Sequence, residues 1–267
     1  MPANRLLKRD WQKDHVYLVQ FPRAGCIVTP SPFALKMETW LRVTDVPYSN
    51  ISNNFNIKSS KGQIPFIELN GRQIADTSFI IEHLKKEFHK DLDAHLTTSE
   101  RASATAYTAL LENNLFWCLA YNRSRHNWFA TEDGMIKHFS GLKKTAFQKF
   151  FSKQLQKRIT GAVFAQGTGR HSPTEVDEII KENLNALSVL LGNKDFFFGT
   201  KPTTFDCTAF GQLAQLYYTP LISDVPKKHL KEACPNLEAF IFRMKDRYWP
   251  DWDELLKTLS LENTKKE

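Results

Sequence analysis

The chain has 267 residues, a net charge of +7, 42% hydrophobic residues and 24% charged residues, which are ordinary values for a globular protein of about two domains. No apolar stretch reaches the roughly 20 residues of a membrane-spanning helix, and no basic block is long enough to indicate nucleic-acid binding. The four cysteines show neither a CxxC pair nor zinc-ligand spacing, which predicts reduced thiols, no bound metal and a cytoplasmic location.

A polar N-terminal extension, residues 1–14, comes first. It has no apolar signal region, and its acidic residues argue against a mitochondrial address. Residues 15–90 then predict a small α/β domain. Two local signals mark its elements: Ser31-Pro32 starts a helix, and Asn70-Gly71 is a strong hairpin signal. In chain order, the expected elements are a strand at 15–21, a helix at 33–43, strands at 46–51, 63–69 and 72–75, and a helix at 79–88.

After a linker at 89–98, residues 98–261 predict an all-helical second domain. Its expected helices are 99–122, 131–158, 173–191, 204–218, 226–231 and 235–246. Thr203 and Asp206 form a capping box at the start of one of them.

Residues 143–158 form an amphipathic pattern, in which Phe147, Phe150, Phe151 and Leu155 share one stripe beneath a basic outer face. Such a helix is able to contact a membrane surface. We expect instead that it is buried in the second domain.

Three features of the first domain suit the binding of a thiol peptide. Ile64-Pro65 is a candidate cis peptide bond before a strand, where it would turn the Ile64 backbone groups toward an extended ligand. Asp76 and Thr77 open a helix whose free N–H groups suit an α-carboxylate, while Asp76 suits an α-ammonium. Ser31 stands at a helix start, where the dipole stabilises a thiolate. Each of these polar side chains also has a simpler interpretation as a helix cap.

These features, in this order, resemble the thioredoxin-like half of glutathione transferases, and FGTKPTTFDCTAF resembles the cap of that family's central helix. The segments KDHVYLVQFPR, SPFALKMETWLR, GQIPFIELNGRQIADTSFIIEHL and GTGRHSPTEVDEI more closely resemble the failed axon connections family. That family is a glutathione-transferase-like group that includes cadmium-responsive nematode proteins and is related to metaxins. The resemblance covers most of the chain.

The resemblance implies a thioredoxin-like domain followed by a helical transferase domain, with glutathione as co-substrate. Glutathione would be held by Gln63, Ile64, Pro65, Asp76 and Thr77. Ser31 would be the catalytic residue that stabilises its thiolate. A dimer, common in that family, is left open.

The sequence also departs from the transferase pattern. The loop from Pro22 to Pro30 is an insertion that puts thiol activation by Ser31 in doubt, and it carries Cys26, which we interpret as a buried thiol rather than a nucleophile. Two functions therefore stay open. One is conjugation of glutathione to small electrophiles, as in detoxification. The other is a non-catalytic binding or scaffold protein whose partner docks on the basic second domain or at Gly169-Arg170-His171.

Overall fold

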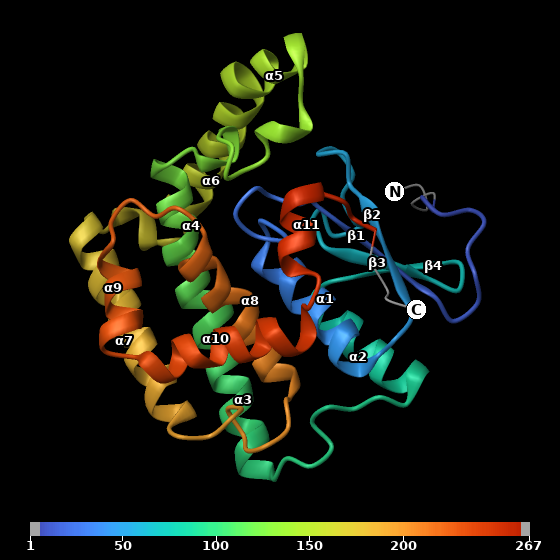
Figure 1. Cartoon of the computed structure of the whole chain (residues 1–267), viewed down its shortest axis with the longest axis vertical. Coiled ribbons are helices and arrows are strands. Elements are labelled where there is room, and N and C mark those ends of the chain that lie inside the picture. Colours follow the sequence, from blue (N-terminus) through green and yellow to red (C-terminus); the bar gives the residue numbers. More distant parts are fainter. Residues whose placement is uncertain (1–5, 263–267) are drawn as a thin grey trace.

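The computed structural model describes residues 6–262, and its first part is a four-stranded sheet with two helices (Figure 1). The elements of this part are β1 (Val16–Gln20), α1 (Pro32–Thr44), β2 (Tyr48–Ser52), β3 (Phe66–Leu69), β4 (Arg72–Ala75) and α2 (Thr77–Phe88). The strand order is β2-β1-β3-β4, with β1 parallel to β2 and antiparallel to β3. The predicted order of strands and helices is confirmed.

Local sequence explains these elements. All five residues of the inner strand β1 are buried, as expected for an apolar run that is covered on both faces. The β3–β4 turn has positive φ at both central residues, 47° at Asn70 and 79° at Gly71, which is what the Asn-Gly pair favours. The described part of the N-terminal extension lies along this hairpin, because the Leu7 and Lys8 N–H groups donate to the Glu68 carboxylate at 2.8 and 2.9 Å.

The second part is helical from Thr98 onward. A nearly continuous rod comprises α3 (Thr98–Leu110), a π-helical segment (Leu111–Leu115) and α4 (Phe116–Arg125). A second rod comprises α5 (Gly141–Ala146), another π-helical segment (Phe147–Phe151) and α6 (Ser152–Gln166). The remaining helices are α7 (Pro173–Leu191), α8 (Thr204–Tyr218), α9 (Val225–Glu232), α10 (Pro235–Tyr248) and α11 (Trp252–Thr258).

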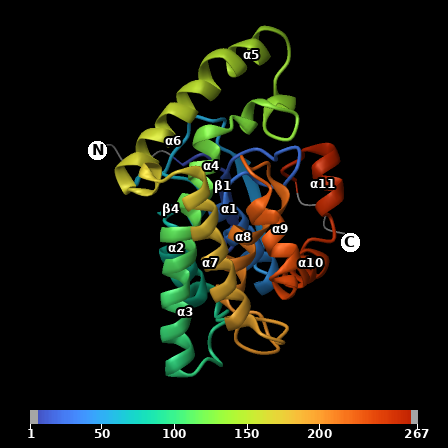
Figure 2. The ribbon, with the colours of Figure 1, turned by 90° about the vertical axis from the view of Figure 1, so that its left-hand side faces the viewer.

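Helix α8 is central to the helical part and joins it to the first part. The capping box predicted for Thr203 and Asp206 is present at its start. It packs closely on α1, because a Cβ on Gly211 would lie only 2.6 Å from the Pro32 carbonyl oxygen. Figure 2 shows α8 inside the helical layer, while α5 and α6 extend beyond it.

Two helix predictions need correction. Residues 131–158 are not one helix: the chain turns back on itself before α5, and the helical rod then continues to Gln166. The turn is tight at Gly134, where a Cβ would lie 2.3 Å from the Trp128 carbonyl oxygen. Helix α11 was not predicted, since its seven residues follow Pro250 and are too few for a clear helical period. Within residues 6–262, none of the helices has both the length and the apolar character that crossing a bilayer requires.

Candidate functional site

Ser31 lies at the N-cap of α1 and is 8% exposed. Its hydroxyl accepts a hydrogen bond from the Ala34 N–H at 3.2 Å. This is the capping role that Ser favours, and Pro32 follows at the first helical position. The cap uses the hydroxyl oxygen as an acceptor and leaves its O–H able to donate to a thiolate, but the residue is largely covered.

The loop before Ser31 is clamped to the helical part. The buried Arg123 guanidinium donates to the Pro30 carbonyl at 2.8 Å and to the Gln215 side-chain oxygen at 2.6 Å. The Gln215 amide in turn donates to the Thr29 carbonyl at 2.9 Å. Burial lowers the pKa of Arg123, and the oxygen acceptors around it compensate for part of the lost hydration.

The middle of the same loop pairs with the turn before α5. The Gly25 N–H donates to the Gly134 carbonyl at 2.9 Å, and the Cys26 N–H donates to the Asp133 carbonyl at 3.0 Å. Burial, with a smaller contribution from the Asp133 charge, raises the pKa of the Cys26 thiol to about 12. At neutral pH the thiolate is scarce, which argues against Cys26 as a nucleophile, although its side chain is half-buried rather than buried as predicted.

At its start, the loop is tied to α1 by a buried ion pair. The Arg23 and Glu38 side chains are both 0% exposed, and their two N–H···O contacts are 2.7 and 2.8 Å long. Burial by itself would raise the pKa of Glu38, but the charge and hydrogen bonds of Arg23, with the charge of Arg42, outweigh it and hold the pKa at about 2. Glu38 is thus charged at any physiological pH.

An aromatic cluster fills the apolar space beside the loop. The Phe55 ring lies 5.3 Å from that of Phe139, 5.7 Å from that of Phe147 and 6.0 Å from that of Phe151, measured between centroids. A cavity of only about 10 Å³ remains. Its lining residues are Phe21, Pro30, Phe55, Phe129, Met135, Phe147, Phe151 and Leu155. Pro30, the residue before Ser31, lines this filled space, whereas Ser31 itself is not among its lining residues.

The other predicted site residues come together at one end of the β3–β4 pair. Phe66 on β3 is paired with Ala75 on β4, so the residues before Phe66 and after Ala75 are neighbours. The Ile64-Pro65 peptide bond is cis, as predicted. Ile64 is half-buried, Pro65 is buried and Gln63 is exposed.

Asp76 and Thr77 begin α2 beside that proline. One Asp76 carboxylate oxygen accepts from the Ser78 N–H at 3.1 Å, and the other lies 3.8 Å from the Lys61 ammonium. The Asp76 side chain is 43% exposed and can still meet a ligand ammonium. The residues of this end could therefore hold the γ-glutamyl part of glutathione, whereas Ser31 is largely covered.

Two charged residues that the sequence interpretation missed complete this end. The Lys36 ammonium donates to the Thr77 hydroxyl at 3.4 Å and to the Glu112 carboxylate at 2.8 Å. Lys36 is 3% exposed although it lies on α1 among buried residues. A lysine on the apolar face of a predicted helix was the available signal, because such a residue is buried only when it is paired.

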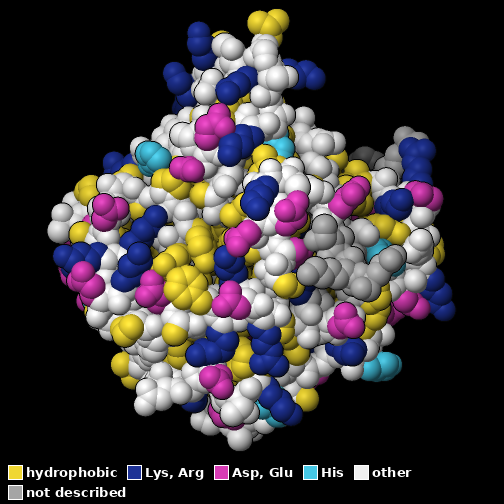
Figure 3. All heavy atoms as spheres, in the orientation of Figure 1, with side chains coloured by type: hydrophobic (Ala, Val, Ile, Leu, Met, Phe, Trp, Pro, Cys, Tyr) yellow, Lys and Arg dark blue, Asp and Glu magenta, His cyan; other side chains and the backbone are white. Residues whose placement is uncertain are grey.

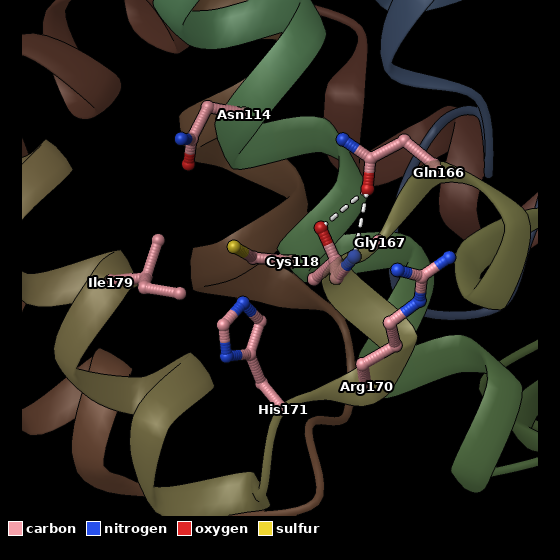
Figure 4. Close-up of a pocket in the computed structure, with 8 residues that line it drawn as sticks. Asn114, Cys118, Gln166, Gly167, Arg170, His171 and Ile179 are labelled. Carbon is pink, nitrogen blue, oxygen red and sulfur yellow. Dashed lines mark hydrogen bonds between the residues drawn. The ribbon is translucent and has the colours of Figure 1, made fainter.

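A more open cavity lies in the helical part, at the turn between α6 and α7. Its volume is about 430 Å³. Its lining residues are Asn114, Cys118, Gln166, Gly167, Thr168, Arg170, His171 and Ile179, with no carboxylate among them (Figure 4). Thr168 is held by the Gln166 side-chain oxygen, which accepts from its N–H and its hydroxyl. The distinctive string around Gly169-Arg170-His171 thus contributes Arg170 and His171 to one wall of this hollow, and the Glu175 carboxylate lies 3.9 Å from the His171 ring.

Known proteins were compared with the chain. A family described as glutathione S-transferase N-terminal domain matches residues 32–128, and one described as glutathione S-transferase C-terminal domain matches residues 180–244. The isoprene-epoxide–glutathione S-transferase of Rhodococcus is 26% identical over 82% of this chain and 92% of its own length. A crystal structure of a rice glutathione transferase in complex with glutathione covers 93% of this chain and 96% of its own, with a TM-score of 0.57 and 14% identity.

Failed axon connections of Drosophila melanogaster is a more similar relative, with 40% identity over 262 residues. The match covers 95% of this chain and 63% of the fly protein, so the chain spans less than two thirds of that relative. The two transferase domains occur in the order that the structure shows, and the predicted fold class is confirmed. The chain belongs to the glutathione S-transferase-like family that includes Failed axon connections.

Proposed function

We propose that this protein is a non-catalytic binding protein built on the glutathione transferase fold. The observation that carries the proposal is the aromatic packing that fills the space lined by Pro30, the residue before Ser31. Conjugation requires a thiolate and an electrophile held next to each other. The cavity of about 10 Å³ that remains between the aromatic rings holds at most about one water molecule.

The chain's own contacts also argue against thiol activation. The Ser31 hydroxyl caps α1, and Arg123, Gln215 and Gly134 hold the loop that would have to move to uncover it. These contacts come from two helices and one turn of the helical part. Opening the site would therefore cost several buried hydrogen bonds at once.

We propose that glutathione, or another γ-glutamyl compound, is a ligand of this protein rather than a substrate. The half-exposed Asp76 carboxylate would take the ligand ammonium, and Thr77 with the α2 N-terminus would take its carboxylate. The Lys36 ammonium donates to the Thr77 hydroxyl and is itself paired with Glu112, so it helps to position Thr77. A second candidate function is a glutathione transferase. The observation that favours it is this same group of residues, Asp76 and Thr77 at the start of α2.

Calorimetric titration and a conjugation assay with a generic aryl halide separate the two candidates. We expect Asp76→Asn to weaken glutathione binding about tenfold, because it loses one charge-assisted contact but keeps the helix cap. Asp10→Asn, which alters an exposed acid elsewhere, should change nothing. Conjugation should stay at the uncatalysed rate in every variant. Turnover above that rate that falls in Ser31→Ala would refute the proposal and establish the transferase.

The binding partner is expected at the open cavity between α6 and α7. Arg170 lines it without an ion-pair partner among the described residues, which favours an acidic group on the partner, whereas His171 lies 3.9 Å from the Glu175 carboxylate. Arg170→Glu should therefore abolish co-purification of the partner from the source cells, whereas Arg72→Glu, an exposed reversal on β4, should not. Equal co-purification by both variants would exclude the cavity as the docking site.

We propose a cytoplasmic location, since all four cysteines are free thiols.

A further inference from the structure

The rod formed by α5, the second π-helical segment and α6, Gly141–Gln166, carries an unusual concentration of positive charge. We call this rod the basic arm. It contains no Asp or Glu, and its six cationic residues almost equal the net charge of +7 of the whole chain. These are Lys143, Lys144, Lys149, Lys153, Lys157 and Arg158. Within the described chain, the only ion pair of the arm joins Lys144 to Glu132, at 3.5 Å.

The apolar side chains of the arm fall into two groups, one packed against the rest of the protein and one exposed. Phe147 and Phe151 on its inner face pack in the aromatic cluster beside the first domain, as expected for a buried stripe. The expectation is wrong for Phe150, which does not join that cluster. On its outer face, Leu142 is 90% exposed and Phe150 is 73% exposed. Leu142 and Phe150 are each adjacent in sequence to a lysine, Lys143 or Lys149, whereas Phe164, which is 58% exposed near the other end of the arm, is not.

The arm also projects from the molecule. Figures 1 and 2 show α5 and α6 standing beyond the other helices, with α5 at the outer end. In Figure 3 this end carries a hydrophobic group at its tip and dark blue basic side chains around it. A projecting end with apolar side chains inside a ring of lysines can reach a flat surface without interference from the rest of the protein.

We propose that the basic arm docks this protein on an anionic lipid bilayer. Leu142 and Phe150 would enter the headgroup and acyl boundary, and the lysines would bind the acidic headgroups. Charge complementarity selects an acidic surface. The aliphatic Leu142 at the start of the arm favours lipid over nucleic acid, which is bound by phosphate contacts and aromatic stacking. We propose a peripheral attachment, in which the arm lies on the surface of the bilayer and does not cross it.

Sedimentation with phosphatidylcholine vesicles, with and without phosphatidylserine, tests the proposal on the full chain. Binding is expected only with phosphatidylserine, and it should weaken as salt is raised. The double variant Lys143→Glu with Lys149→Glu should lower the partition coefficient by at least about tenfold, since each lysine near an acidic membrane surface adds to the free energy of membrane binding. Leu142→Ser with Phe150→Ser should lower it by about tenfold.

Matched variants away from the arm provide the controls. Lys201→Glu with Lys257→Glu changes the net charge equally, and Val189→Ser removes an apolar side chain that is 82% exposed on α7. Both should bind like the unmodified chain. The proposal is overturned if the controls lose binding as strongly as the arm variants, if phosphatidylserine has no effect, or if a duplex RNA competitor displaces the protein from vesicles at equal phosphate. None of these readouts involves glutathione, so they are independent of the proposed function.

Discussion

Glu38→Gln is expected to lower the free energy of unfolding by about 3–5 kcal/mol, because it leaves the Arg23 guanidinium buried without a counter-charge. Arg23 and Glu38 are both fully buried and share two short contacts. The Glu38 carboxylate also accepts hydrogen bonds from Gln20, Tyr48 and Asn50. A glutamine has the same shape but offers one acceptor instead of two, and it donates toward groups that already donate.

The same substitution should change how stability depends on pH. The pKa of Glu38 is depressed from 4.5 to about 2, so its contribution to stability is complete above pH 4.5 and is lost as the pH falls toward 2. That contribution amounts to about 3 kcal/mol. Glu38→Gln should therefore flatten the fall in stability across this acidic range.

Denaturant titrations at several pH values measure both effects. Glu82→Gln is the control, since it makes the same chemical change in an ion pair whose acid is 61% exposed. Its effect should stay below about 1 kcal/mol. A loss of similar size in both variants would mean that the buried pair contributes no more than a surface pair.

Gly25→Ala is expected to detach the loop before Ser31 from the helical part. An alanine Cβ would lie 1.9 Å from the Glu132 carbonyl oxygen, closer than any non-bonded contact allows. The obstructing atom belongs to the backbone, so the two segments must separate and the paired hydrogen bonds of Gly25 and Cys26 must break. We expect a loss of about 2–4 kcal/mol in stability.

Cys26 reports on this detachment. Its thiol is deprotonated only near pH 12 in the intact protein, so alkylation by iodoacetamide at neutral pH should be very slow. In Gly25→Ala the loop should hydrate, the pKa should fall toward 9.0, and the alkylation rate of Cys26 should rise by at least about tenfold. Peptide mapping by mass spectrometry follows the modification of each cysteine separately.

Gly161→Ala is the matched control. Nothing lies within 4 Å of a Cβ added at that helical position, so this variant should be slightly stabilised and leave Cys26 unreactive. Should Gly25→Ala keep both its stability and a protected Cys26, the loop would not be clamped as the contacts indicate. The filled space lined by Pro30 would then be open to exchange, and the argument against conjugation would weaken.

Local patterns in the sequence determined the elements and one end of the candidate site. The Asn70-Gly71 turn, the Ser31 cap and the Thr203–Asp206 capping box depend on residues within a few positions of one another, so a single sequence contains the information. Asp76 and the cis peptide bond before Pro65 flank a hairpin that the sequence predicts. Their proximity followed from that hairpin.

Only the tertiary structure decided how the loop before Ser31 is packed and whether space is left beside it. Arg123 reaches the Pro30 carbonyl from 93 residues away, and Gly25 lies against Glu132 across a similar separation. Phe55 meets Phe139 and Phe147 in the same way. Amphipathic periodicity shows that such residues face inward, but it does not show which distant segment they will meet. Close packing between segments far apart in the chain therefore filled the space that the sequence pattern, read alone, left available for catalysis.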